Sequence, residues 1–190
     1  MKDRGIEVLH AGMNIPNSLT ILRILLIPVY VGLLVYGEFD RALIVLLVAG
    51  VTDALDGTIA RAANQKTRLG ALLDPLADKL LLTSGFITLS TIHMIPSWVT
   101  IVVVSRDVIL LLGTAVAKYT ESPIDIAPTI LGKGTTFLQL SYVLLVIFLS
   151  SRQTDPAILN PLLFGMIGFT LCSGFHYLYR GYLHTGSPNS

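Results

Sequence analysis

Long apolar runs separated by short polar breaks most strongly constrain the fold of this 190-residue chain. A helix needs about 20 predominantly apolar residues to cross a bilayer. Six runs approach or reach that length, and they cover residues 21–36, 41–63, 69–92, 98–117, 135–149 and 158–179. Only 13% of the residues are charged, whereas soluble domains carry about 25%. The sequence therefore predicts an all-α integral membrane protein whose six transmembrane helices form a single bundle.

The positions of lysine and arginine predict how this bundle is oriented. With the amino terminus in the cytoplasm, most basic residues fall on the cytoplasmic side, and Arg41 and Arg152 remain outside. Residues 1–20 then form a cytoplasmic or interfacial segment, residues 21–180 the six-helix domain, and residues 181–190 a flexible tail. We expect a multi-pass protein of a bacterial inner membrane. The net charge of +1 gives no reason to expect a nucleic-acid partner.

Four aspartates interrupt the apolar pattern. Asp53 and Asp56 fall late in the second predicted helix, and Asp74 and Asp78 fall early in the third. Because the second helix runs inward and the third runs outward, all four are expected at the cytoplasmic end of the bundle. At about 100° per residue, each pair shares one helical face. Acidic residues within membrane helices are costly and mark functional sites, so we expect the active site at this end.

Facing carboxylates repel one another unless a cation lies between them. A site made only of carboxylate oxygens suits magnesium or manganese better than zinc, so the spacing predicts one or two divalent cations. Gly57, Ala60 and Gly70 lack large side chains and leave room for a bulky ligand beside the acids. A divalent-cation transporter would use the same acids, but the opposite half of each helix is almost uncharged and offers an ion no pathway.

The acids also belong to a longer motif. The segment "DALDGTIARAANQKTRLGALLDPLAD", residues 53–78, fills every fixed position of the pattern D-x-x-D-G-x-x-A-R, eight residues, G-x-x-x-D-x-x-x-D. It resembles the signature of the CDP-alcohol phosphatidyltransferase family. The segment "NIPNSLTILRILLIP" is similar to the amino-terminal part of phosphatidylglycerophosphate and cardiolipin synthases. This resemblance implies a six-helix enzyme that transfers a phosphatidyl group from CDP-diacylglycerol to an alcohol and releases CMP.

The resemblance also implies roles for single residues. Asp53, Asp56 and Asp74 would hold two Mg²⁺ or Mn²⁺ ions, and Asp78 would be a partial ligand and the general base that deprotonates the acceptor hydroxyl. The residues that would bind the CDP group are Asp53, Gly57, Ala60, Arg61 and Gly70. The family further implies a homodimer surrounded by membrane lipids.

The acceptor is harder to predict. Arg106 in the fourth predicted helix and Lys133 at the start of the fifth could bind an acceptor phosphate, which favours glycerol 3-phosphate. Phosphatidylglycerol is the alternative, because the arginine-aspartate pair in "SRDVILLLGTAVAKY" also resembles cardiolipin synthases. A structural pairing of Arg106 with a carboxylate stays open.

Two residues at the start of the first helix complete the candidate set. Asn17 and Arg23 are expected beside the phosphates of the donor. The alternatives are that Asn17 caps the helix and that Arg23 reaches back to the membrane surface.

Overall fold

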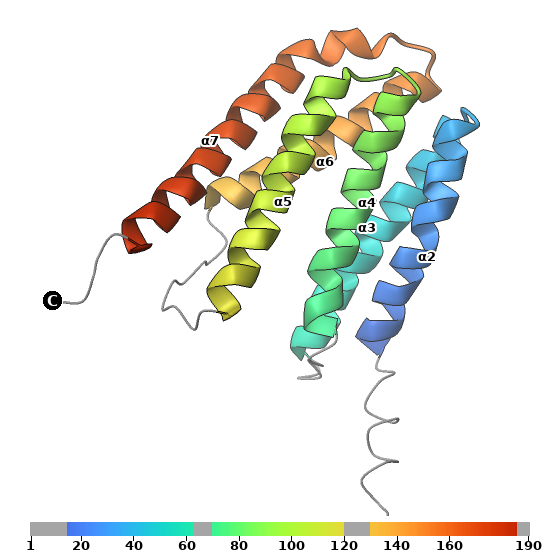
Figure 1. Cartoon of the computed structure of the whole chain (residues 1–190). Coiled ribbons are helices and arrows are strands. Elements are labelled where there is room, and N and C mark those ends of the chain that lie inside the picture. The colour runs from blue at the N-terminus through green and yellow to red at the C-terminus, as the bar shows by residue number, and fades with distance from the viewer. Residues whose placement is uncertain (1–14, 63–69, 120–129, 186–190) are drawn as a thin grey trace, which may run out of the picture. The chain divides into compact units, whose positions relative to one another are not determined.

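The computed structural model describes residues 15–62, 70–119 and 130–185, and the side chains of 20–52, 77–113, 132 and 134–175. Every regular element within these ranges is helical (Figure 1). The α-helices are α2 (Ile15–Val35), α3 (Phe39–Ala62), α4 (Gly70–Thr91), α5 (Ser97–Tyr119), α6 (Ile130–Ser151) and α7 (Asn160–Thr185), and a 3₁₀ helix, η1 (Pro156–Leu159), precedes α7. The prediction of an all-helical fold is therefore confirmed.

Each of the six apolar runs falls largely within one of these α-helices, but several helices extend beyond the apolar residues. Helix α2 begins at Ile15 and accommodates Pro16 in its first turn, where a missing N–H costs no helical hydrogen bond. Helix α6 begins at Ile130, before the apolar run that starts at Thr135. Polar residues continue a helix as readily as apolar ones, so hydropathy locates the helices better than it locates their ends.

Three helices end in the same way, with one residue in the left-handed conformation. These residues are Gly37 after α2, His93 after α4 and Gln153 after α6, with φ of 75°, 61° and 55°. In each case the next backbone N–H bonds a carbonyl five positions back, at 2.8 to 2.9 Å, which is the Schellman pattern. The chain therefore reverses sharply, and the following helix starts after a short connection.

The chain divides into two compact units. The first unit is Met1–Thr88, with α2, α3 and most of α4, and the second unit is Leu89–Ser190, with α5, α6, η1 and α7. Each has its own apolar core. The largest fully buried apolar side chains are Tyr30, Leu34 and Phe86 in the first unit, and Leu89, Val99, Val103, Val143, Val146, Ile147 and Met166 in the second.

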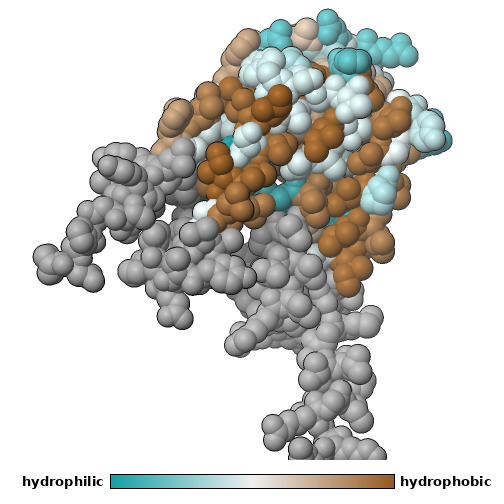
Figure 2. Space-filling model, in the orientation of Figure 1, coloured by the Kyte–Doolittle hydropathy of each residue, from teal (hydrophilic) through white to brown (hydrophobic). Residues whose placement is uncertain are grey.

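Many large apolar side chains point outward, and Figure 2 shows hydrophobic patches interspersed with paler residues on the visible face. Among the described residues, the segments Gly134–Ser151 and Pro156–Phe175 are long and apolar enough to cross a membrane. They are 39% and 28% buried, so less than half of each segment lies inside the protein, unlike the core helix of a soluble protein. The remaining predicted spans and the orientation of the bundle stay predictions.

Candidate active site

The motif residues lie near the C-terminal end of α3 and near the N-terminal end of α4, which is the next helix in the chain. Asp53 and Asp56 belong to the last turns of α3, and Asp74 and Asp78 to the first turns of α4. The structure describes the side chain of Asp78. The other predicted members of the donor and metal site, Asp53, Asp56, Gly57, Ala60, Arg61, Gly70 and Asp74, lie outside the described side chains.

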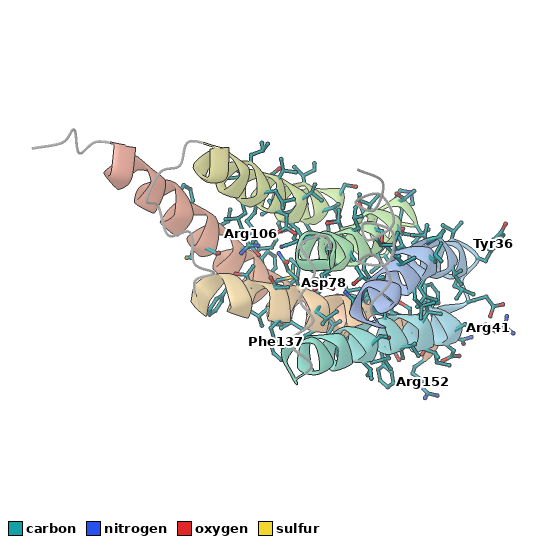
Figure 3. All side chains as sticks on the ribbon, turned by 90° about the horizontal axis from the view of Figure 1, so that it is seen from below. Tyr36, Arg41, Asp78, Arg106, Phe137 and Arg152 are labelled. Atoms are coloured by element: carbon teal, nitrogen blue, oxygen red, sulfur yellow. The ribbon has the colours of Figure 1, made fainter. Side chains whose placement is uncertain are left out.

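Asp78 is held by an arginine from another helix. The guanidinium Nη1 of Arg23, on α2, donates to Oδ1 of Asp78 at 2.8 Å. A hydrogen bond between two charged groups at this distance is among the stronger non-covalent contacts in proteins. The pair is asymmetric, because the arginine side chain is 1% exposed and the aspartate side chain is 48% exposed. Asp78, labelled in Figure 3, is thus anchored from inside the unit, and about half of its side chain is exposed.

The pairing with Asp78 contradicts the alternative that Arg23 reaches back to the membrane surface. Thr20, Arg23, Tyr30 and Leu34 are all buried and follow one stripe of α2 at helical spacing. An arginine that reached back to the membrane surface would expose its guanidinium, whereas this one is sealed inside the first unit. The expected contact of Arg23 with the donor phosphates stays a prediction, as does the role of Asn17, whose side chain lies outside the described residues.

A second contact joins the same two helices about two turns further along. The ring of Tyr30, on α2, packs against Gly85, on α4. A Cβ atom built on Gly85 would lie 2.7 Å from the Tyr30 hydroxyl. Such a distance is too short for any side chain, so this contact requires glycine. Because both contacts advance in the same direction along the two helices, α2 and α4 run parallel here.

The second unit contains another buried arginine. Arg106, in the middle of α5, is 6% exposed. Its Nη1 donates to Oδ1 of Asp107 at 2.8 Å, and its Nη2 donates to the Ser173 hydroxyl on α7 at 3.1 Å. The pairing with a carboxylate, left open by the sequence, is therefore present. The Nε of Arg106 has no hydrogen-bond partner within the described part of the chain, so one donor of this guanidinium remains.

Further polar side chains lie inside the second unit. The Gln139 amide on α6 donates to the Thr170 hydroxyl on α7 at 3.4 Å, and the Thr135 hydroxyl donates to the carbonyl of Phe169 at 3.4 Å. Gln139, Thr170 and Ser173 were not singled out from the sequence. Their signal was available, since each is a lone polar residue within an apolar run. Lys133, the other predicted phosphate ligand, lies in the first turns of α6 with its side chain outside the described residues.

Comparison with known sequences decides the family. A sequence model described as CDP-alcohol phosphatidyltransferase matches residues 13–172, which include the whole motif and parts of both units. The chain belongs to the CDP-alcohol phosphatidyltransferase family. The family predicted from the motif is thereby confirmed.

Relatives within the CDP-alcohol phosphatidyltransferase family carry two kinds of name. A probable cardiolipin synthase (CMP-forming) of Drosophila melanogaster is 39% identical over 148 residues, which are 69% of this chain and 46% of that protein. The human cardiolipin synthase (CMP-forming) is 38% identical over 68% of this chain and 48% of its own length. The chain thus spans about half the length of these relatives.

A Bacillus subtilis CDP-diacylglycerol–glycerol-3-phosphate 3-phosphatidyltransferase is 30% identical to this chain over 193 residues. That match covers 89% of this chain and 95% of the relative. The alignment with the glycerol-3-phosphate enzyme is therefore longer, and those with the cardiolipin synthases are closer per residue.

Proposed function

We propose that this protein transfers a phosphatidyl group from CDP-diacylglycerol to an alcohol acceptor and releases CMP. The observation that carries the proposal is the complete motif with its eight fixed positions between Asp53 and Asp78, in a chain that belongs to the CDP-alcohol phosphatidyltransferase family. The exposed apolar helix faces support a lipid environment, in which the acyl chains of the donor would stay. We further propose six membrane spans, a cytoplasmic site and a homodimer.

The motif acids are proposed to hold two divalent cations, Mg²⁺ or Mn²⁺. The donor set fits these ions, because it consists of carboxylate oxygens, and Asp78 presents a half-exposed carboxylate one helical turn beyond Asp74. Bound there, the cations would neutralise charge that develops on the pyrophosphate oxygens while CMP leaves.

The protein side chains are proposed to accept the proton of the acceptor and to bind the CDP group. Asp78 accepts the proton of the acceptor hydroxyl, whose oxygen forms a bond to the phosphatidyl phosphorus as the bond from that phosphorus to CMP breaks. Asp53, Gly57, Ala60, Arg61 and Gly70 bind the CDP group, a role carried over from the family motif.

We propose that the acceptor carries a phosphate that Arg106 and Lys133 bind. The remaining Nε donor of buried Arg106 supports this role, because a buried donor gains most from a charged acceptor atom. We place phosphatidylglycerol first, since the relatives named cardiolipin synthase are 38% to 39% identical and the chain carries the adjacent Arg106 and Asp107. Glycerol 3-phosphate, favoured from the sequence alone, is the second candidate, supported by the long match to the Bacillus subtilis enzyme.

Acceptor-dependent release of CMP tests this proposal. Purified protein in detergent receives CDP-diacylglycerol and Mg²⁺ with either phosphatidylglycerol or glycerol 3-phosphate, and the lipid products are identified by mass spectrometry. We expect CMP and cardiolipin from phosphatidylglycerol. Phosphatidylglycerophosphate from glycerol 3-phosphate, with no cardiolipin, would instead establish the second candidate. No CMP with either acceptor would contradict the proposed reaction.

A further inference from the structure

Arg23 is the most deeply buried charged side chain with a described partner in the first unit, and the proposed reaction gives it no role beyond a phosphate contact. Removing a guanidinium from water is costly unless a counter-charge compensates it. Here the carboxylate of Asp78 provides that charge at 2.8 Å. The arginine reaches this position because it lies on the buried stripe of α2 with Thr20 and Tyr30.

The two partners differ in exposure, and this difference indicates which residue positions the other. Arg23 is 1% exposed and Asp78 is 48% exposed. In this pair the guanidinium fixes one carboxylate oxygen from inside, and the same carboxylate remains accessible from outside. A carboxylate offers about four lone-pair sites and can therefore accept more than one hydrogen bond, and the exposure of Asp78 gives a ligand access to it.

The contact between Tyr30 and Gly85 sets the position of this arginine. Its close approach, 2.7 Å from the hydroxyl to the site of a missing Cβ, leaves α2 and α4 little freedom to slide past each other. The two helices therefore pack closely at a point about two turns from the ion pair. A side chain on α2 at position 23 is thereby held opposite position 78 of α4.

We infer that Arg23 is a positioning residue that orients the carboxylate of Asp78 toward the acceptor hydroxyl. This inference rests on the proposed function, in which Asp78 is the general base. Arg23 acts through Asp78 and does not bind the phosphates of the donor. The role differs from that of Arg41, which is 70% exposed and pairs with Glu38 at 3.4 Å within one turn of chain.

A double-mutant cycle tests the inference, with R23Q, R23K, D78N and the R23Q/D78N double variant, and with R41Q as the matched control. The kcat and the KM for CDP-diacylglycerol are measured from CMP release with labelled donor. We expect R23Q to lower kcat by about 10- to 100-fold, as misplacement of a reacting group does, with the donor KM within about twofold of wild type. The lysine variant should recover part of that loss, and R41Q should match wild type.

The cycle itself gives the decisive comparison. In the D78N background, R23Q should change the residual rate by less than about twofold, because its target is already gone. The unfolding midpoints of the four proteins should show the same non-additivity without reference to activity. Independent, multiplying losses in kcat, or a raised KM for the donor with R23Q, would overturn the positioning role and assign Arg23 to the donor phosphates. A wild-type protein that releases no CMP would overturn the proposed function itself.

Discussion

At the scale of single residues, the chain keeps two arginines out of water and bonds each to an aspartate. Arg23 meets an acid 55 residues away on another helix, whereas Arg106 meets its neighbour in the chain, Asp107. A charged group in such a place is retained at a cost, so both are functional candidates. Their partners differ, and so do their proposed roles, since one orients a base and the other binds an acceptor.

The acceptor role of Arg106 predicts a specific kinetic change. Ser173→Ala removes the hydroxyl that accepts from Nη2 of Arg106 and leaves the guanidinium in place. Losing one hydrogen bond to a charged group costs about 1.5–3 kcal/mol, so we expect a rise of roughly 10- to 100-fold in the acceptor KM. The KM for CDP-diacylglycerol should not change.

The matched control for this prediction is Ser150→Ala, since Ser150 bonds the carbonyl of Val146 within its own helix. Both constants should stay at their wild-type values in this control. An unchanged acceptor KM in Ser173→Ala would remove the support that the geometry gives to Arg106.

The sequence identified both arginines as candidate site residues, but it did not predict the full set of side chains that each one contacts. Arg23 was placed beside the donor, because a pattern along one helix does not show which residue of another helix it will meet. The pairing with Asp78 depends on how α2 packs against α4, and in particular on Gly85, which the sequence presents as one of 16 glycines. Ser173 was missed for the same reason, since its role depends on the packing of α7 against α5.

At the scale of elements, the parallel packing of α2 and α4 predicts an unusual mutational pattern. Gly85→Ala should raise helix propensity by about 1 kcal/mol, yet its Cβ would lie 2.7 Å from the hydroxyl of fully buried Tyr30. We expect net destabilisation of about 1–3 kcal/mol, as for other overpacked cores. The measurement is the unfolding midpoint in detergent.

Tyr30→Phe should rescue that variant. It removes the hydroxyl, which has no hydrogen-bond partner within the described side chains, and leaves ring atoms at 3.4 and 3.5 Å. The double variant should therefore be at least as stable as wild type. Gly50→Ala, on α3, is the control, because nothing lies within 4 Å of its Cβ and the variant should not lose stability. A double variant no more stable than Gly85→Ala would show that the hydroxyl contact does not fix this pair of helices.

Within the described residues, hydropathy predicted the order of the helices well, because each apolar run must be helical if it lies in lipid. It predicted their ends less well. Helix α6 starts at Ile130, among glycines and a lysine, and α7 follows a 3₁₀ turn whose first N–H groups are capped by Asp155. Such ends depend on local hydrogen bonds, here 2.9 Å from the Ala157 N–H to the carboxylate of Asp155, which hydropathy does not register.

At the scale of the whole molecule, the proposed roles are divided between the two compact units. The motif acids and Arg23 belong to the first unit, and Arg106, Lys133 and Ser173 belong to the second. The family match over residues 13–172 includes both sets, which is consistent with a single catalytic function of the chain.

The motif acids are proposed to bind divalent cations and to carry out phosphatidyl transfer. The most direct measurement is CMP release from CDP-diacylglycerol by wild type, Asp56→Asn and Asp40→Asn, each with Mg²⁺ and with EDTA. Asp40 is the control, because it is an exposed acid in the first turn of α3, far along the helix from the motif. We predict that wild type and Asp40→Asn release CMP with Mg²⁺ and stop in EDTA, and that Asp56→Asn is slower by at least about 100-fold. Undiminished release by Asp56→Asn, or by wild type in EDTA, would contradict the account.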